Sequence, residues 1–372
     1  MNVHNKTHCT DRRTVHPVTT PEQLAEIAGR LASQALIGLD TEFLRERTYH
    51  AQLCLLQLAW SDGAACIDPL ALTDLGALRG TLSAPPAVKV VHASRQDLEV
   101  LLPAVGPIRP LFDTQIAAAL AGESAQIGYA ELVRRLLGVE LAKAHTRTDW
   151  SRRPLSAEQI EYALDDVRHL LALKETLQER LDRLGRLSWL AEELAALEDP
   201  ALLTVDPDQA WRRLKGLSGL DAGRQRLLRS LAAWRERRAL ERNRPRGWIL
   251  EDGLVREIVL RVPRTPTALG ALPGMPAGLI ERCGSQILAR VEAAEIPDPP
   301  PPVSRPRPDP VRNARLKQLA AVLREAAAEL GLSPEVLATR HDLEQLVEGR
   351  DDTAVLRGWR REVLGERLLA AR

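Results

Sequence analysis

The sequence predicts a multidomain protein in which a mixed α/β domain is followed by two small all-α domains. Short β-rich runs alternate with helical patterns over roughly the first 200 residues, which is typical of an α/β domain. After about residue 206 only helical periodicity is left. Eight prolines in the fourteen positions 297–310 then exclude a helix or a central strand and indicate an extended linker. A chain of 372 residues is long enough for this organisation.

These composition changes set the domain boundaries. We expect a disordered tail over 1–17, an α/β domain over 18–205, a helical domain over 206–295, a proline-rich linker over 296–310 and a second helical domain over 311–372. The tail has no apolar stretch, so we do not expect a secretory signal. No apolar run approaches the ~18 residues of a membrane span, so we expect no membrane partner.

The elements of the α/β domain follow from local patterns. We expect a helix from about Pro21, and strands over 35–41, 51–60, 64–67 and 88–91. Ser-Asp-Gly between the second and third strands predicts a hairpin turn, so part of the sheet is antiparallel. Ser156 and Gln159 form a capping box that opens a helix continuing to Leu170, and apolar spacing predicts a further helix over 221–242.

The four cysteines are scattered and form no CxxC pair. This spacing excludes a disulfide framework and a zinc site, and it is typical of small buried residues in a reducing compartment. We therefore expect a cytoplasmic protein.

Charge is distributed unevenly along the chain. Residues 1–200 carry a formal charge of −6 and residues 201–372 carry +7, with twelve basic and five acidic residues between 201 and 250. Such a concentration could lie along a nucleic-acid backbone, or it could be the solvated face of an arginine-rich helix. Charge alone leaves both alternatives open.

Three acidic motifs could carry chemistry. Asp40 and Glu42 lie two residues apart on a predicted strand, so both side chains leave the same face, where their repulsion could be offset by Mg²⁺ or Mn²⁺. Asp97 falls in the first turn of a helix whose expected N-cap is Ser94, a position that also favours an acidic residue for purely structural reasons.

The third motif is Tyr162 and Asp166, at positions i and i+4 of one helical face. The carboxylate could hold a metal ion while the phenol positions or deprotonates a water. Taken singly, a tyrosine on a helix is usually a packing residue. We expect His92 and Asp113 to be structural and Asp165 to be only a neighbour of the motif.

Taken in order, the motifs LDTEF, HASRQDLEVL and YALDD resemble those of the tyrosine-containing branch of the DEDD 3'-5' exonucleases. The connecting segments FDTQIAAAL and TRTDWSRRPLS make the similarity to the ribonuclease D family closer. From about residue 208 onward, the sequence resembles HRDC domains, which are small helical nucleic-acid-binding modules, and the last segment resembles a second, diverged HRDC-like domain.

This resemblance implies a ribonuclease H-like fold for the first domain and a metal-dependent 3'-5' exoribonuclease that releases nucleoside 5'-monophosphates. Two divalent ions, Mg²⁺ or Mn²⁺, would be held by Asp40, Glu42, Asp97 and Asp166, with Asp40 bridging them and Tyr162 orienting the attacking water. The expected partner is RNA with a single-stranded 3' end, tRNA precursors above all, and no obligate protein partner is implied.

Arginines are the expected RNA contacts, because phosphate binding needs cations away from the acidic site. We expect these contacts to come from Arg147, Arg153, Arg235, Arg238, Arg242, Arg244 and Arg246, with help from Trp150, whereas Trp211 and Trp234 belong to the core. Two other functions stay open at this point: a DNA 3'-5' exonuclease of the same superfamily, and a catalytically silent RNA-binding protein on this fold.

Overall fold

The computed structural model describes residues 16–141, 148–217, 219–298 and 309–372. Most of the expected tail over 1–17 and of the expected linker over 296–310 therefore lies outside the described residues. The chain divides into two compact units. Unit 1 contains Met1–Leu44, Leu53–Leu203 and Arg315–Arg372, and unit 2 contains Arg45–Gln52 and Thr204–Ala314.

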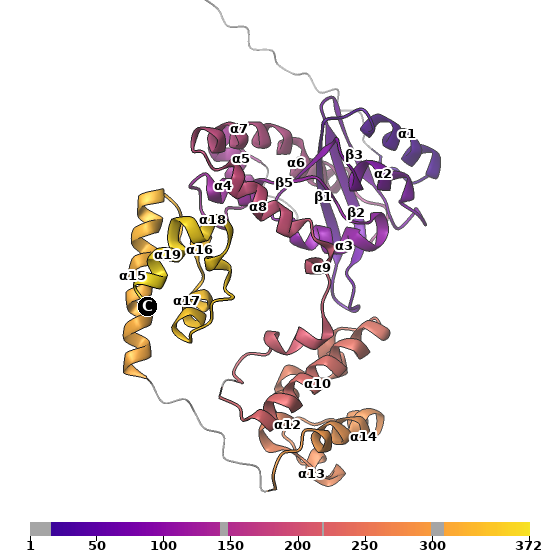
Figure 1. The fold of residues 1–372 in the computed structure, drawn as a ribbon. Coiled ribbons are helices and arrows are strands. Elements are labelled where there is room, and N and C mark those ends of the chain that lie inside the picture. Colours follow the sequence, from indigo (N-terminus) through magenta and orange to yellow (C-terminus); the bar gives the residue numbers. More distant parts are fainter. Residues whose placement is uncertain (1–15, 142–147, 218, 299–308) are drawn as a thin grey trace, which may run out of the picture. The chain divides into compact units, whose positions relative to one another are not determined.

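Unit 1 is built on a five-stranded sheet (Figure 1). Its strand order is β3-β2-β1-β4-β5. The strands are β1 (Leu36–Leu44), β2 (Gln52–Trp60), β3 (Gly63–Ile67), β4 (Val88–Val91) and β5 (Leu111–Asp113). β4 is parallel to both β1 and β5, whereas β2 and β3 form an antiparallel hairpin in which Trp60 pairs with Gly63. The predicted mixed sheet is thus confirmed. Strand β5 was not predicted, because three residues are too short to show a period of two.

Helices cover both faces of this sheet. The helices of the α/β part are α1 (Pro21–Leu31), α2 (Arg79–Ser83), α3 (Arg95–Val105), α4 (Thr114–Leu120), α5 (Tyr129–Leu137), α6 (Ala157–Arg168), α7 (Leu170–Arg183), α8 (Leu187–Leu197) and α9 (Pro200–Leu203). A Cβ placed on Gly38 of β1 would lie 3.2 Å from the Val167 carbonyl oxygen, so α6 lies directly on that face. Ile37 and Leu39 point to the opposite face, and both are buried in the core that includes Leu98 of α3.

The C-terminal helices share the core of the α/β part. They are α15 (Pro310–Leu330), α16 (Pro334–Leu337), α17 (Arg340–Val347), α18 (Gly358–Arg360) and α19 (Glu366–Ala370). The rings of Trp189 and Trp359 stack with their centroids 4.5 Å apart, and Trp359 Nε1 donates to Glu193 at 2.9 Å. Arg360 completes the contact with an ion pair to Glu193. These aromatic and charged contacts place Arg315–Arg372 in unit 1.

Unit 2 is helical, as predicted. Its helices are α10 (Ala222–Glu241), α11 (Arg246–Ile249), α12 (Asp252–Arg261), α13 (Pro266–Gly270) and α14 (Ala277–Ala293), preceded by a 3₁₀ segment, η2 (Pro207–Arg213). The segment Arg45–Gln52, which joins β1 to β2, belongs to this unit. The Tyr49 hydroxyl donates to the buried Glu236 carboxylate at 2.5 Å, and the Asn243 side-chain oxygen accepts from Tyr49 N at 3.0 Å.

The described cysteines behave as packing residues. Cys54, Cys66 and Cys283 are buried and carry free thiols, and burial raises the pKa of Cys54 to about 11 and that of Cys66 to about 12. Cys9 lies outside the described residues. None of the helices in the described ranges combines the length and the apolarity that a bilayer span requires.

Candidate active site

The first two predicted acids lie on β1, where its ladder with β4 has ended. β4 pairs with β1 from Leu36 to Gly38, so Asp40 and Glu42 lie beyond the last paired residue. Burial raises the pKa of Asp40 well above its usual range, and the charges of Asp97, Asp166 and Glu42 raise it further. Burial, Asp166 and Asp97 raise the pKa of Glu42 to about 8. The two side chains on β1 therefore belong to one crowded acidic group.

Asp97 reaches this group from the start of α3. The Thr41 hydroxyl, on the strand residue between the two acids, donates to Asp97 Oδ1. Burial raises the pKa of Asp97 to about 6, although the bond from Thr41 lowers it. Ser94 occupies the predicted N-cap position, but its hydroxyl makes no cap bond and instead donates to Asp113 at 2.9 Å. A side chain from another strand thus fixes the turn that places Asp97.

Asp113, expected to be structural, is the brace of that turn. Its carboxylate accepts from the backbone N–H groups of Ala93 at 3.2 Å and Ser94 at 3.0 Å, and it caps α4 through Gln115 and Ile116. Ala93 has a φ of 54°, a left-handed conformation that these bonds help to hold. Asp113 is therefore saturated with donors and acts by positioning α3.

Tyr162 and Asp166 reach the same group from α6. The predicted capping box is present, with the Ser156 hydroxyl accepting from Gln159 N and the Gln159 side chain accepting from Ser156 N. Burial, followed by the charge of Asp165, raises the pKa of Asp166 to about 7. Burial and the charges of Asp166, Glu42 and Asp40 raise the pKa of Tyr162 to about 12.

A tryptophan restrains the tyrosine ring. Trp150 is 5% exposed, and its ring stacks on that of Tyr162 with centroids 6.3 Å apart and an angle of 26° between the planes. In the metal-free protein the phenol keeps its proton at neutral pH, so it can orient a water molecule rather than remove a proton from it. The sequence had associated Trp150 with substrate, whereas its contact is with Tyr162.

The acidic group has the charge expected of a divalent-cation site. Four carboxylates converge from β1, α3 and α6. Burial favours the protonated form of each, and the charges of Asp97 and Asp166 add to this effect at Asp40 and Glu42. Hard divalent cations prefer such oxygen ligands and would offset the charge. Within the described ranges, however, no three His, Cys, Asp or Glu side chains are placed so that they could hold a metal ion as they stand.

The raised carboxylate pKa values and the absence of a ready metal cluster among the described residues reflect interactions over different distances. Charge repulsion acts across several ångströms, whereas a bound Mg²⁺ draws its ligands to about 2 Å. The carboxylates thus share one neighbourhood without the close contacts that only a cation would impose.

Residues around the acidic group are structural, as expected. His92 Nδ1 lies 2.9 Å from the Thr114 hydroxyl and its Nε2 lies 3.1 Å from the Ile127 carbonyl oxygen. Asp165 pairs with Arg168 at 2.5 Å on the outer side of α6. Thr41 and Tyr129 were not predicted. The Tyr129 hydroxyl accepts from His169 N and donates to the Asp165 carbonyl, which supports the end of α6.

The structure corrects the prediction that Arg153 contacts RNA. Its five N–H donors are all used, by both carboxylate oxygens of Asp68 and by the carbonyls of Cys54, Trp150 and Arg152. A guanidinium engaged in this way has no donor left for a phosphate. Arg153 therefore holds the Trp150 loop to the sheet. Arg147 lies outside the described residues.

The structure also corrects the predicted RNA contact of Arg235. It is 2% exposed and donates to the Leu250 carbonyl at 2.9 Å and to Asp252 at 2.6 Å, so it cannot reach an RNA strand on the surface of unit 2. It stands at a position of α10 that faces the interior, which residue type alone does not reveal. Trp234, expected in the core, is buried there, and Trp211 is half-buried beside it.

The remaining predicted arginines differ in exposure. Arg242 and Arg244 are exposed, Arg246 is half-buried 3.9 Å from Glu236, and Arg238 is half-buried and donates to Gln286 at 3.3 Å. Trp248 was not predicted; it is 59% exposed and its ring lies 5.6 Å from the Arg244 guanidinium. A tryptophan close in sequence to several arginines is the pattern that could have indicated Trp248 as a nucleic-acid contact.

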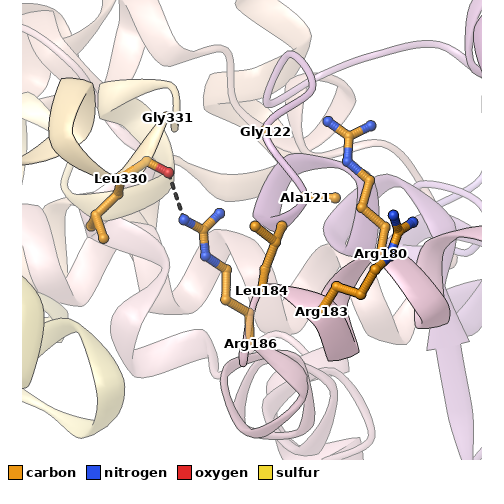
Figure 2. Close-up of a pocket in the computed structure, with 8 residues that line it drawn as sticks. All are labelled: Ala121, Gly122, Arg180, Arg183, Leu184, Arg186, Leu330 and Gly331. Atoms are coloured by element: carbon orange, nitrogen blue, oxygen red, sulfur yellow. Dashed lines mark hydrogen bonds between the residues drawn. The ribbon is translucent and has the colours of Figure 1, made fainter.

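A cavity of about 420 Å³ elsewhere in unit 1 has a different character. Figure 2 shows its lining, in which Arg186 donates to the Leu330 carbonyl at 2.5 Å. Arg186 also donates to the Leu120 carbonyl, and Arg180 pairs with Glu123 at 2.9 Å. Arg186 thus joins the C-terminal helices to the α/β part, whereas the Arg180 ion pair lies within the α/β part; none of the predicted acids lines the cavity.

Comparisons with known proteins agree with this arrangement. A 3'-5' exonuclease family model matches residues 15–182, and an HRDC domain model matches residues 224–291. The chain is 42% identical to ribonuclease D of Gluconacetobacter diazotrophicus and 42% identical to that of Granulibacter bethesdensis, in each case over 95% of this chain and 91% of the relative. The crystal structure of Escherichia coli RNase D, described as an exoribonuclease involved in structured RNA processing, matches with a TM-score of 0.85 and 32% identity, over 96% of this chain and 98% of that one.

Proposed function

We propose, on the premise that this chain belongs to the ribonuclease D family and is a 3'-5' exoribonuclease, that it trims the 3' ends of structured RNAs such as tRNA precursors. The products would be nucleoside 5'-monophosphates. The observation that carries the proposal is the convergence of Asp40, Glu42, Asp97 and Asp166: burial raises the pKa of all four, and the charges of Asp97 and Asp166 raise the pKa of Asp40 and Glu42 further.

Membership of this exonuclease family implies dependence on divalent metal. We propose that two ions, Mg²⁺ or Mn²⁺, would be held by Asp40, Glu42, Asp97 and Asp166. Two ions so held would lower the pKa of the attacking water and stabilise the leaving 3'-oxygen. The raised carboxylate pKa values support this assignment. They show that the ionised form of each carboxylate is disfavoured in the protein, and a bound cation would stabilise that form.

The part assigned to Tyr162 is positional. Its protonated hydroxyl can accept or donate a hydrogen bond at the edge of the acidic group, and the stacked Trp150 ring restricts its rotation. We propose that this hydroxyl orients the nucleophilic water. No covalent intermediate is required, since all the roles are positioning and charge stabilisation.

The substrate of this family is RNA, and we propose that unit 2 helps to hold it. The acidic group repels a polyanion, so affinity must come from cations and stacking surfaces elsewhere. Arg242 and Arg244 are exposed, and Trp248 presents an indole on which a base can stack. Contacts of this kind bind a strand without reading its sequence.

The test is Asp40→Asn, assayed on a 3'-tailed RNA carrying a 5' label, with added Mg²⁺ or Mn²⁺. We expect hydrolysis to fall to background while RNA affinity, measured in chelator, is unchanged, because Asn keeps the shape and removes the charge. Asp165→Asn is the matched control, since it changes the neighbouring acid that faces Arg168. Unchanged degradation by Asp40→Asn would remove Asp40 from the mechanism.

The same assay separates the alternatives. A matching 3'-tailed DNA degraded faster than the RNA would favour the DNA exonuclease. Intact RNA at every metal concentration, with binding retained, would favour the silent RNA-binding protein.

A further inference from the structure

Gln57 is a buried amide outside the acidic group of the active site. It lies in the middle of β2 with no exposed surface. Neither Nε2 nor Oε1 has a hydrogen-bond partner among the described residues. A buried amide without partners destabilises a fold, so such a group in the centre of a sheet needs an explanation.

The strand geometry places Gln57 beside Asp40. β1 and β2 are neighbours in the sheet and are joined by only seven residues, too few for the crossover that parallel strands need, so they are antiparallel. A Cβ placed on Gly38 would lie 3.4 Å from that of Ala59, which sets these two residues opposite each other. Moving two residues along each strand in opposite directions sets Asp40 opposite Gln57, on the same face.

This face is the one that α6 covers. Gln57 pairs with Cys66 on the β3 side, and Cys66 packs with Ile160 and Ala163 of α6. The amide thus lies in the layer between the sheet and the helix that carries Tyr162, with Asp40 as its neighbour on β1. Gln57 itself has no exposed surface, so its amide is a protein donor available to Asp40 within this layer.

We propose that Gln57 is a positioning residue for the metal site, with its Nε2–H group donating to the Asp40 carboxylate when cations are bound there. This rests on the proposed function. A neutral donor favours the charged form of a buried carboxylate and fixes its rotamer without adding a competing charge. The remaining carboxylate lone pairs stay available to the two ions.

Metal binding tests the proposal without using catalysis. Calorimetric titration with Mn²⁺ should show an affinity roughly ten-fold or more lower for Gln57→Met, which has a similar length and no polar atoms. In chelator the same variant should unfold at the same temperature as the wild type or a higher one, because a partnerless buried amide has been removed. Cys66→Ala is the control, since it disturbs packing in the same layer one strand farther from Asp40, and its Mn²⁺ affinity should equal that of the wild type.

The outcomes are separable. If Asp40→Asn keeps wild-type Mn²⁺ affinity, the proposed site is wrong and this inference falls with it. If Asp40→Asn loses binding but Gln57→Met binds normally, only the role of Gln57 is refuted, and the same holds if Gln57→Met loses stability in chelator while keeping its metal affinity. Should the variant fail to fold, a crystal structure of the wild type with Mn²⁺ decides: Gln57 Nε2 within hydrogen-bond distance of Asp40 supports the inference, and a greater separation overturns it.

Discussion

The metal-free protein should lose stability as pH rises because of Glu42, and Glu42→Gln should reverse that loss. Burial and the charges of Asp166 and Asp97 raise the pKa of Glu42 to about 8 in the folded protein, against an ordinary value of 4.5. A raised folded-state pKa means that the stabilising contribution is complete below the unfolded value and is lost as pH rises through the folded one. The window therefore runs from about pH 4.5 to about pH 8.

The size of the effect follows from the two pKa values. One pKa unit corresponds to about 1.4 kcal/mol, so ionising Glu42 between pH 5 and pH 8 costs about 3 kcal/mol. In chelator, Glu42→Gln should match the wild type at pH 5 and exceed it at pH 8 by about that amount, which corresponds to a rise of about 6–12 °C in the unfolding temperature of unit 1. Thermal unfolding at the two pH values measures this directly.

Magnesium supplies the second arm of the experiment. Added Mg²⁺ should stabilise the wild type more at pH 8 than at pH 5, and it should reduce the advantage of Glu42→Gln, because a bound cation offsets the charge that the substitution removes. Glu175→Gln on the exposed side of α7 is the matched control and should show no pH-dependent difference. The reasoning is refuted if Glu42→Gln is equal to or less stable than the wild type in chelator at pH 8.

Two further predictions concern catalysis and RNA binding. Tyr162→Phe should lower kcat roughly 10²-fold or more with little change in KM, because only the orientation of the water is lost; steady-state kinetics on a short RNA measure this, and full activity would exclude the hydroxyl from the mechanism. Trp248→Ala should weaken RNA binding roughly ten-fold by removing one stacking surface. Fluorescence anisotropy in chelator checks this, with Leu202→Ala, another exposed apolar residue at 50% exposure, as the control; equal affinities of Trp248→Ala and the wild type would contradict it.

Patterns carried by neighbouring residues were predictable from the sequence. The capping box at Ser156, the hairpin turn after Trp60 and the shared face of Asp40 and Glu42 all follow from interactions or periodicities spanning a few residues. The structure shows each of them. The bond from Ser94 to Asp113 joins residues 19 positions apart, and strand β5 has only three residues. No local periodicity predicts either feature.

The arginines show where composition fails. Arg153, Arg235 and Arg242 are identical as residue types but differ in environment. Arg153 donates all five hydrogen bonds within the fold, Arg235 is 2% exposed and Arg242 is exposed. Charge counts register all three alike, because burial depends on which helix face meets another segment. Trp248 was overlooked for the same reason, since an indole in a helical pattern usually packs inside.

The sequence by itself determined the order of the elements, the acidic motifs and the family that they resemble, because strand alternation, helix caps and short motifs are encoded within a few residues. Only the tertiary structure decided that carboxylates from β1, α3 and α6 share one neighbourhood, that Asp113 braces the turn before Asp97, and that Gln57 lies next to Asp40. Each of these depends on burial and on contacts between distant segments, and both the shift of a carboxylate pKa and the partners of a buried amide arise only when the chain has closed around them.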